Sequence, residues 1–290
     1  MMPPRLCLAS LVFIASAAFA GAQAPAVSLV ESYAVRAGYS SDETMGAGQV
    51  AVAHFEFGLN GRFSAGNAGM GLAGVGYKTY QIDASGPLLL PESLHEAFVS
   101  VGLATRFSST WAAIAVLKPG FYGDFEEIGG DSFNAPLLVL TTYAARPNLV
   151  WTFGLNVNAV SENPVLPALG VRWGFSPDWT FNLAFPRTEV SYQANESLAY
   201  SFGIRFEGGN YRVTDNLGVP AAGVARLANT FVDFTEIRVG AGLSYAFGES
   251  MKLQLEAGMM TDRKFDYFDR DYTYNGDAGT FFSVSLEGRF

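Results

Sequence analysis

The sequence contains one cysteine, two histidines and little charge for its 290 residues. Charged residues make up 16% of the chain, whereas soluble domains average about 25%. The single cysteine excludes a disulfide scaffold. The net charge of −9 argues against a nucleic-acid partner, because such proteins need a basic face to neutralise phosphate. Hydrophobic residues reach 49% and aromatic residues 14%, which excludes a disordered chain.

Long apolar runs are missing after residue 20, so we predict no transmembrane helix in the rest of the chain. Residues 6–19 are almost continuously apolar, follow Arg5 and precede the small-residue site Ala18–Ala20. This order is typical of a secretory signal peptide. The run is shorter than the roughly 20 residues of a spanning helix, which favours cleavage over an uncleaved anchor. We predict a signal peptide at 1–20 and one domain at 21–290.

Alternation of apolar and polar residues is the main pattern of the predicted mature chain. In 237–247, for example, Ile237, Val239 and Leu243 share one face while Arg238 and Ser244 occupy the other. Alternation at period two indicates β-strands. We predict fourteen strands, with twelve as the fallback because the ninth and tenth are weakest. The predicted strands are 29–40, 48–59, 69–81, 95–107, 110–118, 136–145, 148–159, 165–175, 178–185, 188–194, 198–212, 235–247, 251–261 and 280–290.

The connections between these strands favour a barrel over a soluble sandwich. Most connections after even-numbered strands are tight, whereas 82–94, 119–135, 213–234 and 262–279 are long. Short turns at one end and long loops at the other are typical of outer-membrane barrels. The polar face is small and weakly charged, which suits the inner wall of a cylinder better than a surface in water. Closure also satisfies every backbone N–H and C=O in lipid.

We therefore predict an all-β fold, a transmembrane antiparallel up-and-down β-barrel with both termini in the periplasm. Rings gather near the tight turns, where a membrane-interface girdle is favoured over an ordinary aromatic core because these side chains lie at strand ends. The rings concerned are Phe107, Trp111, Phe175, Trp179, Tyr245 and Phe247.

The last nine residues resemble the terminal strand of Gram-negative outer-membrane β-barrels, which end in an aromatic residue preceded by alternating apolar residues. Phe282, Val284, Leu286 and Phe290 carry the resemblance, and Gly288 departs from it. The resemblance implies location in the outer membrane, contact with its lipid and lipopolysaccharide, and recognition by the barrel-assembly machinery. The stretch 170–180 is also similar to an outer-membrane family of unknown function, which implies no activity.

Candidate catalytic groups are few. Gly69–Gly74 fits G-x-G-x-x-G, but Val75, Tyr77 and Thr79 continue a strand where a nucleotide site needs a helix. Outer-membrane phospholipases place a serine two residues after the catalytic histidine, and neither His54 nor His95 has one. His95 with Glu92 and Glu96 is a loose match to the acid–histidine group of outer-membrane proteases. A structural histidine is the favoured interpretation, so we predict no enzyme and no cofactor.

Acidic residues concentrate in the predicted long loops. Asp271, Thr273, Asn275 and Gly276 echo the start of a calcium loop, but Phe282 stands where the bidentate glutamate would be. A weak divalent-cation site that bridges to lipopolysaccharide stays open, and a solvated loop is the favoured alternative. Asp124, Glu126, Glu127 and Asp131 are interpreted in the same way.

Inward-facing charges are the candidate site. Opposite charges on neighbouring strands would brace the barrel, whereas unpaired arginines would favour anions in a pore. Bracing is favoured, because an unpaired buried arginine is costly. Fourteen strands enclose more space than small side chains fill, so a lumen is expected unless long loops fold inward. The predicted lumen-lining residues are Arg36, His54, Glu56, Arg172, Arg205, Arg238 and Glu256.

The function that these features favour is a porin-like channel for passive or selective passage of small solutes. A non-conducting structural or surface-binding barrel is the alternative, and an outer-membrane hydrolase is a weaker one. Composition and pattern leave the solute and the oligomeric state undetermined.

Overall fold

The computed structural model describes residues 28–290, so the predicted signal peptide at 1–20 lies outside the described residues. One continuous sheet contains all seventeen strand segments, and three short 3-10 helices join some of them. The 3-10 helices are η1 (Gly66–Ala68), η2 (Gly130–Ser132) and η3 (Phe268–Arg270). The strands are β1 (Ser28–Met45), β2 (Gly48–Ser64), β3 (Met70–Ser85), β4 (Ser93–Arg106), β5 (Trp111–Leu117), β6 (Gly120–Gly123), β7 (Phe133–Asn134), β8 (Leu137–Arg146), β9 (Leu149–Val157), β10 (Val165–Gly174), β11 (Trp179–Leu183), β12 (Arg187–Gln193), β13 (Leu198–Val213), β14 (Thr230–Phe247), β15 (Met251–Tyr267), β16 (Tyr272–Gly276) and β17 (Gly279–Arg289).

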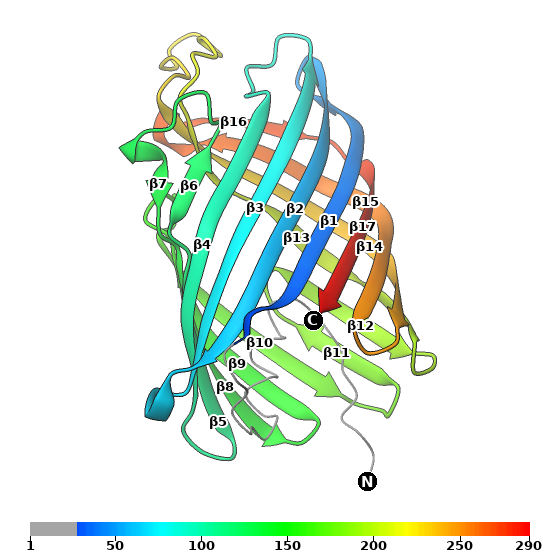
Figure 1. Cartoon of the computed structure of the whole chain (residues 1–290). Coiled ribbons are helices and arrows are strands. Elements are labelled where there is room, and N and C mark those ends of the chain that lie inside the picture. Colours follow the sequence, from blue (N-terminus) through cyan, green and yellow to red (C-terminus); the bar gives the residue numbers. More distant parts are fainter. Residues whose placement is uncertain (1–27) are drawn as a thin grey trace.

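The sheet closes into an antiparallel barrel of fourteen strands, because the first strand pairs with the last (Figure 1). Ser32 of β1 lies opposite Arg289 of β17, and the pairing continues to Ser40 and Phe281. The segments β6, β7 and β16 extend neighbouring strands and are not counted separately. The predicted fold class and strand count are confirmed, including the weak pair that became β11 and β12. Among the described residues, no helix is long and apolar enough to cross a membrane.

The strands differ in length, and this difference divides the molecule into two regions. β1–β4 and β13–β15 are long, whereas β5 and β8–β12 are short and end lower in Figure 1. Above the short strands, β6 pairs with β4 on one side and meets β13 at Arg212 and Gly123 on the other. The long strands therefore close through β6 into a narrower upper ring. We call this ring the cap and the fourteen-stranded part below it the wide barrel.

The alternation of β14 reverses where the cap meets the wide barrel. Val232, Phe234, Glu236 and Arg238 all point inward and are buried. The first two are apolar and lie in the cap, whereas the last two are charged and lie in the wide barrel. Ile237, between them on the opposite face, is the first apolar residue of the outer belt. One strand thus has an apolar inner face in the cap and a polar inner face below it.

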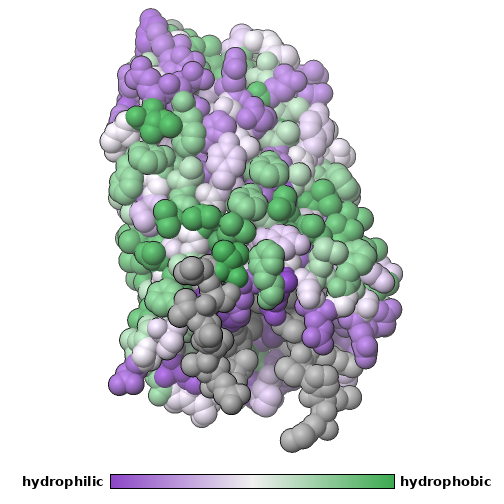
Figure 2. Space-filling view, viewed as in Figure 1, coloured by the Kyte–Doolittle hydropathy of each residue, from purple (hydrophilic) through white to green (hydrophobic). Residues whose placement is uncertain are grey.

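The other long strands reverse at the same level. Their outward side chains are apolar in the wide barrel and polar above it. The uppermost apolar outward residues are Tyr39, Phe55, Tyr77, Val99, Phe206, Ile237, Met259 and Phe282, and the polar ones above them include Ser41, Thr79, His95, Asn210, Thr235, Thr261 and Thr280. Figure 2 shows this as a green middle zone with purple zones above and below it.

The belt of the wide barrel carries the predicted girdle near the tight turns. Phe107, Trp111, Phe175, Trp179, Tyr245 and Phe247 all expose large parts of their rings. Several of the rings contact one another: Trp111 stacks on Tyr143 with centroids 4.7 Å apart, and Tyr245 packs edge-on against Phe247 at 4.8 Å. Exposed rings at strand ends match side chains that favour a lipid–water interface.

The cap is filled by an apolar cluster, so the axis of the barrel is closed at the loop end. Tyr80, Phe234 and Phe265 are almost fully buried, and the Phe234 centroid lies 4.8 Å from each of the other two rings. Leu90 and Leu227 join this cluster from the loops 86–92 and 214–229. The Tyr267 hydroxyl donates to the carbonyl of Leu89 at 3.1 Å, which holds the first of these loops inside.

Three of the predicted long loops were wrong in extent, because their residues belong to the cap. β14 begins at Thr230 and β15 runs to Tyr267, so 230–234 and 262–267 are strand, and the loop 214–229 sends Leu227 into the apolar cluster while more than half of its residues are exposed. The predicted loop 119–135 contains β6 and β7. Reversal of the apolar face makes these segments look unlike a continuation of the membrane strands. The run Leu88–Leu90 was the sequence signal that a loop folds inward.

Candidate functional site

A cavity of about 2110 Å³ occupies the wide barrel. Its lining includes residues at the lower end, such as Gly66 and Asn195 in tight connections and Phe290 after β17. It also includes Ser161 and Asn163, which lie in the connection between β9 and β10 at the loop end. The cavity therefore passes beside the filled cap on the side of the short strands.

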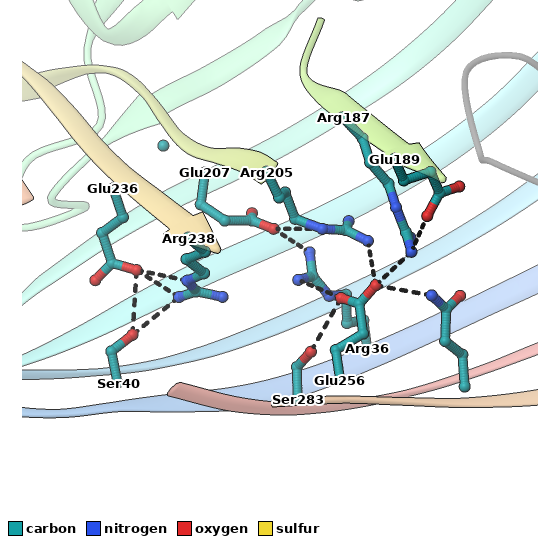
Figure 3. Close-up of polar contacts among 12 residues, drawn as sticks. Arg36, Ser40, Arg187, Glu189, Arg205, Glu207, Glu236, Arg238, Glu256 and Ser283 are labelled. Carbon is teal, nitrogen blue, oxygen red and sulfur yellow. Dashed lines mark hydrogen bonds and ion pairs between the residues drawn. The ribbon is translucent and has the colours of Figure 1, made fainter. Parts of the chain in front are cut away.

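A network of arginines and glutamates lies on the inner wall (Figure 3). Glu256 of β15 accepts from Arg205 at 2.9 Å and from Arg187 at 2.7 Å. Arg36 of β1 reaches the side chain of Glu207 on β13, and three strands lie between β1 and β13 around the wall. The network therefore ties together strands that are not neighbours. This arrangement matches bracing for the arginines that belong to it.

A row of alternating charge continues the network across four adjacent strands. Arg36 lies opposite Glu56, Glu56 opposite Lys78, and Lys78 opposite Glu96. The ammonium of Lys78 lies 3.7 Å from the carboxylate of Glu96. Opposite charges in directly paired positions stabilise a sheet. Arg36, Glu56, Lys78 and Glu96 also line the cavity, so the row is both structural and accessible to a solute.

A second group of charges is sealed between the cavity and the apolar cluster of the cap. The Glu236 carboxylate accepts from Arg238 at 2.5 Å and from Arg263 at 2.8 Å. All three side chains are fully buried. His54 is buried nearby and packs at a tilt against the ring of Tyr80, with centroids 6.2 Å apart. Among the predicted lumen residues, His54 and Arg238 therefore lie in the packed layer above the cavity.

A chain of hydrogen bonds between polar side chains lies at the loop-end opening beside the cap. Asn134 donates to Asn158 at 2.7 Å, Asn158 donates to Asn210 at 2.7 Å, and Asn210 donates to Asp233. This chain ties the connection after β9 to the outer face of β13 and β14 in the cap. Burial raises the pKa of the Asp233 carboxyl to about 6, and the bond from Asn210 opposes that rise. Asn158, Asn210 and Asp233 line the cavity.

Sequence reasoning missed several members of this site. Arg187, Glu189, Glu207 and Lys118 were not singled out, although all four face inward by the same parity that selected Arg205 and Arg36. Arg172 lies apart from the network, in a separate pocket of about 210 Å³ that Asp178 also lines. The structure thus brings Arg36, Arg205 and Glu256 together and leaves Arg172 outside that group.

His95 does not form an acid–histidine group with Glu96. Glu96 points inward and accepts from the Tyr211 hydroxyl, whereas His95 lies on the outer face of β4. The ring nitrogens of His95 contact the hydroxyls of Tyr77 at 2.9 Å and Ser93 at 2.8 Å. Burial lowers the pKa of His95, and the ring stacks on Phe125 with centroids 4.8 Å apart.

The structure places two further sequence motifs on β-strands. Residues 70–74 of the G-x-G-x-x-G match belong to β3, so the match opens a strand where a nucleotide site needs a helix. Thr273 and Asn275 belong to β16, which pairs with β15. These residues therefore lie in an extended strand where the calcium motif needs a loop. The Thr273 hydroxyl donates to Asp266 at 2.9 Å. Within residues 28–290, no group of three or more His, Cys, Asp or Glu side chains is arranged to hold a metal ion.

The residues that resemble the terminal strand of outer-membrane barrels lie on β17 and just after it. Phe282 is half exposed on the outer face, on the same side of the strand as Val284 and Leu286. Phe290 is 81% exposed, and its backbone N–H donates to the carbonyl of Glu31 at 3.0 Å. The Phe290 ring contacts Tyr33 with centroids 5.5 Å apart, so the last residue joins the outer belt near the point of closure.

The sequence identifies the family of this protein. Residues 59–286 match the family described as Domain of unknown function (DUF6268), and the chain belongs to that family. None of the curated proteins matches the sequence.

Solved structures with similar chains are outer-membrane barrels. The NanC porin is 11% identical with a TM-score of 0.42, covering 89% of this chain and 100% of that one. A TodX monoaromatic hydrocarbon channel mutant is 8% identical with a TM-score of 0.47, covering 90% and 91%. LpxR from Salmonella typhimurium is 11% identical with a TM-score of 0.40, covering 89% and 100%. These similar structures belong to the class of protein that the sequence predicts, the outer-membrane β-barrels.

Proposed function

We propose that this protein is an outer-membrane barrel of a Gram-negative bacterium through which small polar solutes pass passively. The signal peptide at 1–20 would direct export, and the terminal segment ending in Phe290 would be recognised by the barrel-assembly machinery. Lipid and lipopolysaccharide would surround the apolar belt. The exposed apolar side chains of this belt support a location in the outer membrane. Passage of this kind requires no catalysis and no cofactor.

The observation that carries this proposal is the cavity of about 2110 Å³, whose lining runs from the turn end to the loop end. The apolar cluster blocks the axis, so the passage lies off-axis, between the cap and the short strands β8–β12. Its lining is polar at the loop end, where Asn156, Asn158, Ser161 and Asn163 contribute. Polar walls of this kind favour solutes that form hydrogen bonds over purely apolar ones.

The test is ion conductance of the purified full-length mature protein in a planar bilayer, after heat-modifiable gel migration has shown that it is folded. Stepwise current increments are expected. Asn156→Trp should reduce the unit conductance several-fold, because Asn156 faces the cavity on β9. Leu155→Trp is the matched control, since the preceding side chain faces outward and should leave conductance unchanged.

A folded protein that is silent at all voltages would overturn the passage. That result would favour the alternative of a non-conducting structural or surface-binding barrel, which the filled cap supports. If Asn156→Trp and wild type conduct equally, the current does not follow the cavity described above.

A further inference from the structure

The cavity has two walls of different electrostatic character. The strands β12–β17 and β1–β4 carry the acidic and basic side chains of the network described above. In contrast, β5 and β8–β11 contain no aspartate or glutamate at all. We call this second set of strands the neutral wall. The inward-facing charges on and beside it are Arg172 and Lys118, which are positive, and Asp178, which directly precedes β11 and lines both pockets.

Lys118 is the cation of the neutral wall that faces the main cavity. It follows β5 directly and is exposed. Its ammonium lies 5.0 Å from the centre of the Phe98 ring, and among the described residues no carboxylate forms an ion pair with it. The Tyr122 hydroxyl donates to the carbonyl of Lys118 at 2.8 Å, which fixes the backbone at this position. Arg172 differs because Asp178 lines the same small pocket.

The wall opposite, which is formed by β12–β17 and β1–β4, does not cancel the charge of Lys118. Glu207 and Glu256 are each held by two arginines or more, so their negative charge is already neutralised locally. Three acids at the lower mouth, Asp178, Glu196 and Glu249, are exposed, where salt screens their charge beyond about 10 Å at 0.1 M ionic strength. Asp233 also lines the loop-end part of the cavity, but among the described residues no ion pair joins it to Lys118, so the ammonium of Lys118 keeps its positive charge there.

We propose that Lys118 makes the passage selective for small polar carboxylates, an inference that rests on the proposed passage. The ammonium pairs with the carboxylate of the solute. The side chains of Asn156, Asn158 and Ser161, which line the same upper part of the cavity, supply hydrogen bonds for its polar groups. A cation over an aromatic ring keeps its charge and stays available to an anion. Lys118 is thus the specificity-determining residue, whereas the arginine network keeps the wall together.

The first test is the reversal potential of the folded protein under a potassium chloride gradient, repeated with potassium gluconate. Wild type should favour chloride over potassium and should carry gluconate. Lys118→Met should lower the anion-to-cation permeability ratio about threefold at 0.1 M salt, and Lys118→Glu should reverse the preference. Lys264→Met is the matched control, since Lys264 lies on the outer face of the cap and pairs with Asp266.

A conducting wild type whose selectivity is unchanged in Lys118→Met, or a loss of equal size in Lys264→Met, would overturn the inference and leave the passage standing. Lys118→Gln provides a second neutral variant if the methionine variant does not fold. Calorimetric titration with gluconate separates the two proposals further. A silent barrel that binds gluconate only with Lys118 intact would overturn passage but support the ligand class, and the absence of binding in a silent barrel would overturn both.

Discussion

The cap and the wide barrel are built from the same strands with opposite faces. In the wide barrel, rings and aliphatic side chains point outward and charged residues point inward, as in β14 with Ile237 outside and Arg238 inside. In the cap, Val232 and Phe234 of the same strand point inward and Asp233 points outward. The cap is therefore constructed like a soluble barrel on top of a membrane barrel. The reversal of polarity marks the upper edge of the apolar belt.

The comparison also explains the course of the cavity. Apolar packing in the cap leaves no axial opening, whereas charge pairs in the wide barrel leave a large cavity beneath it. The short strands β8–β12 end at the level where the cap begins, so the cavity reaches the loop end on their side. Strand length, and not the number of strands, decides where this cavity reaches the loop end.

The largest expected effect is in the cap core. Phe234→Ala should destabilise the cap by about 4 kcal/mol, because it removes a buried ring that contacts Tyr80 and Phe265. Hydrogen exchange in the cap strands should increase while the wide barrel stays protected. Phe202→Ala, on the outer belt, is the control and should leave the cap unaffected. Equal loss of protection in both regions would mean that they unfold as one unit.

Breaking the charge network should have a slightly smaller effect. Glu207→Gln leaves Arg36 and Arg205 without one of their carboxylate partners and should cost about 3 kcal/mol in the wide barrel. Urea unfolding in detergent, followed by loss of heat-modifiable migration, measures the change. A variant as stable as wild type would show that water in the cavity replaces the carboxylate.

A charge introduced by substitution on the outer face tests the position of the upper edge of the apolar belt. Val75→Arg should destabilise the barrel in lipid by about 2 kcal/mol, because Val75 lies in the apolar belt of β3. Gln81→Arg, on the same face of the same strand but in the cap, should have almost no effect. Unfolding of both variants in lipid vesicles gives the comparison, and equal costs would place Gln81 inside the lipid.

The smallest expected effect is a pH dependence of the loop-end opening. The raised pKa of Asp233, about 6 against an ordinary 3.8, means that its protonated form is favoured in the folded state. Its contribution to docking of the connection after β9 is therefore complete below about pH 3.8 and is lost as the pH rises through 6. Hydrogen exchange of residues 158–164, corrected for intrinsic rates, should show more opening at pH 7 than at pH 4. Asp233→Asn should remove this difference.

Much of the wide barrel could be predicted from the sequence because lipid imposes a strict pattern. The predicted strand 165–175 agrees closely with β10, and 198–212 with β13. Parity also placed Arg36, Arg205 and Glu256 on the inner face. It could not identify their partners, because contacts such as Arg36 with Glu207 join strands that are far apart around the wall. Residues 230–234 and 262–267 were missed because the apolar face changes sides there.

The sequence by itself determined that the chain alternates with period two, that its large apolar side chains face one way, and that its strands must close on themselves. These properties are local, and each follows from the need to pair backbone groups and to separate lipid from polar side chains. Only the tertiary structure decided that the long strands close a second time through β6 and that loop leucines fill the space above. It also decided which cations pair with carboxylates and that Lys118 faces the cavity beside the ring of Phe98, because distances across a barrel depend on its closure and not on the order of residues along the chain.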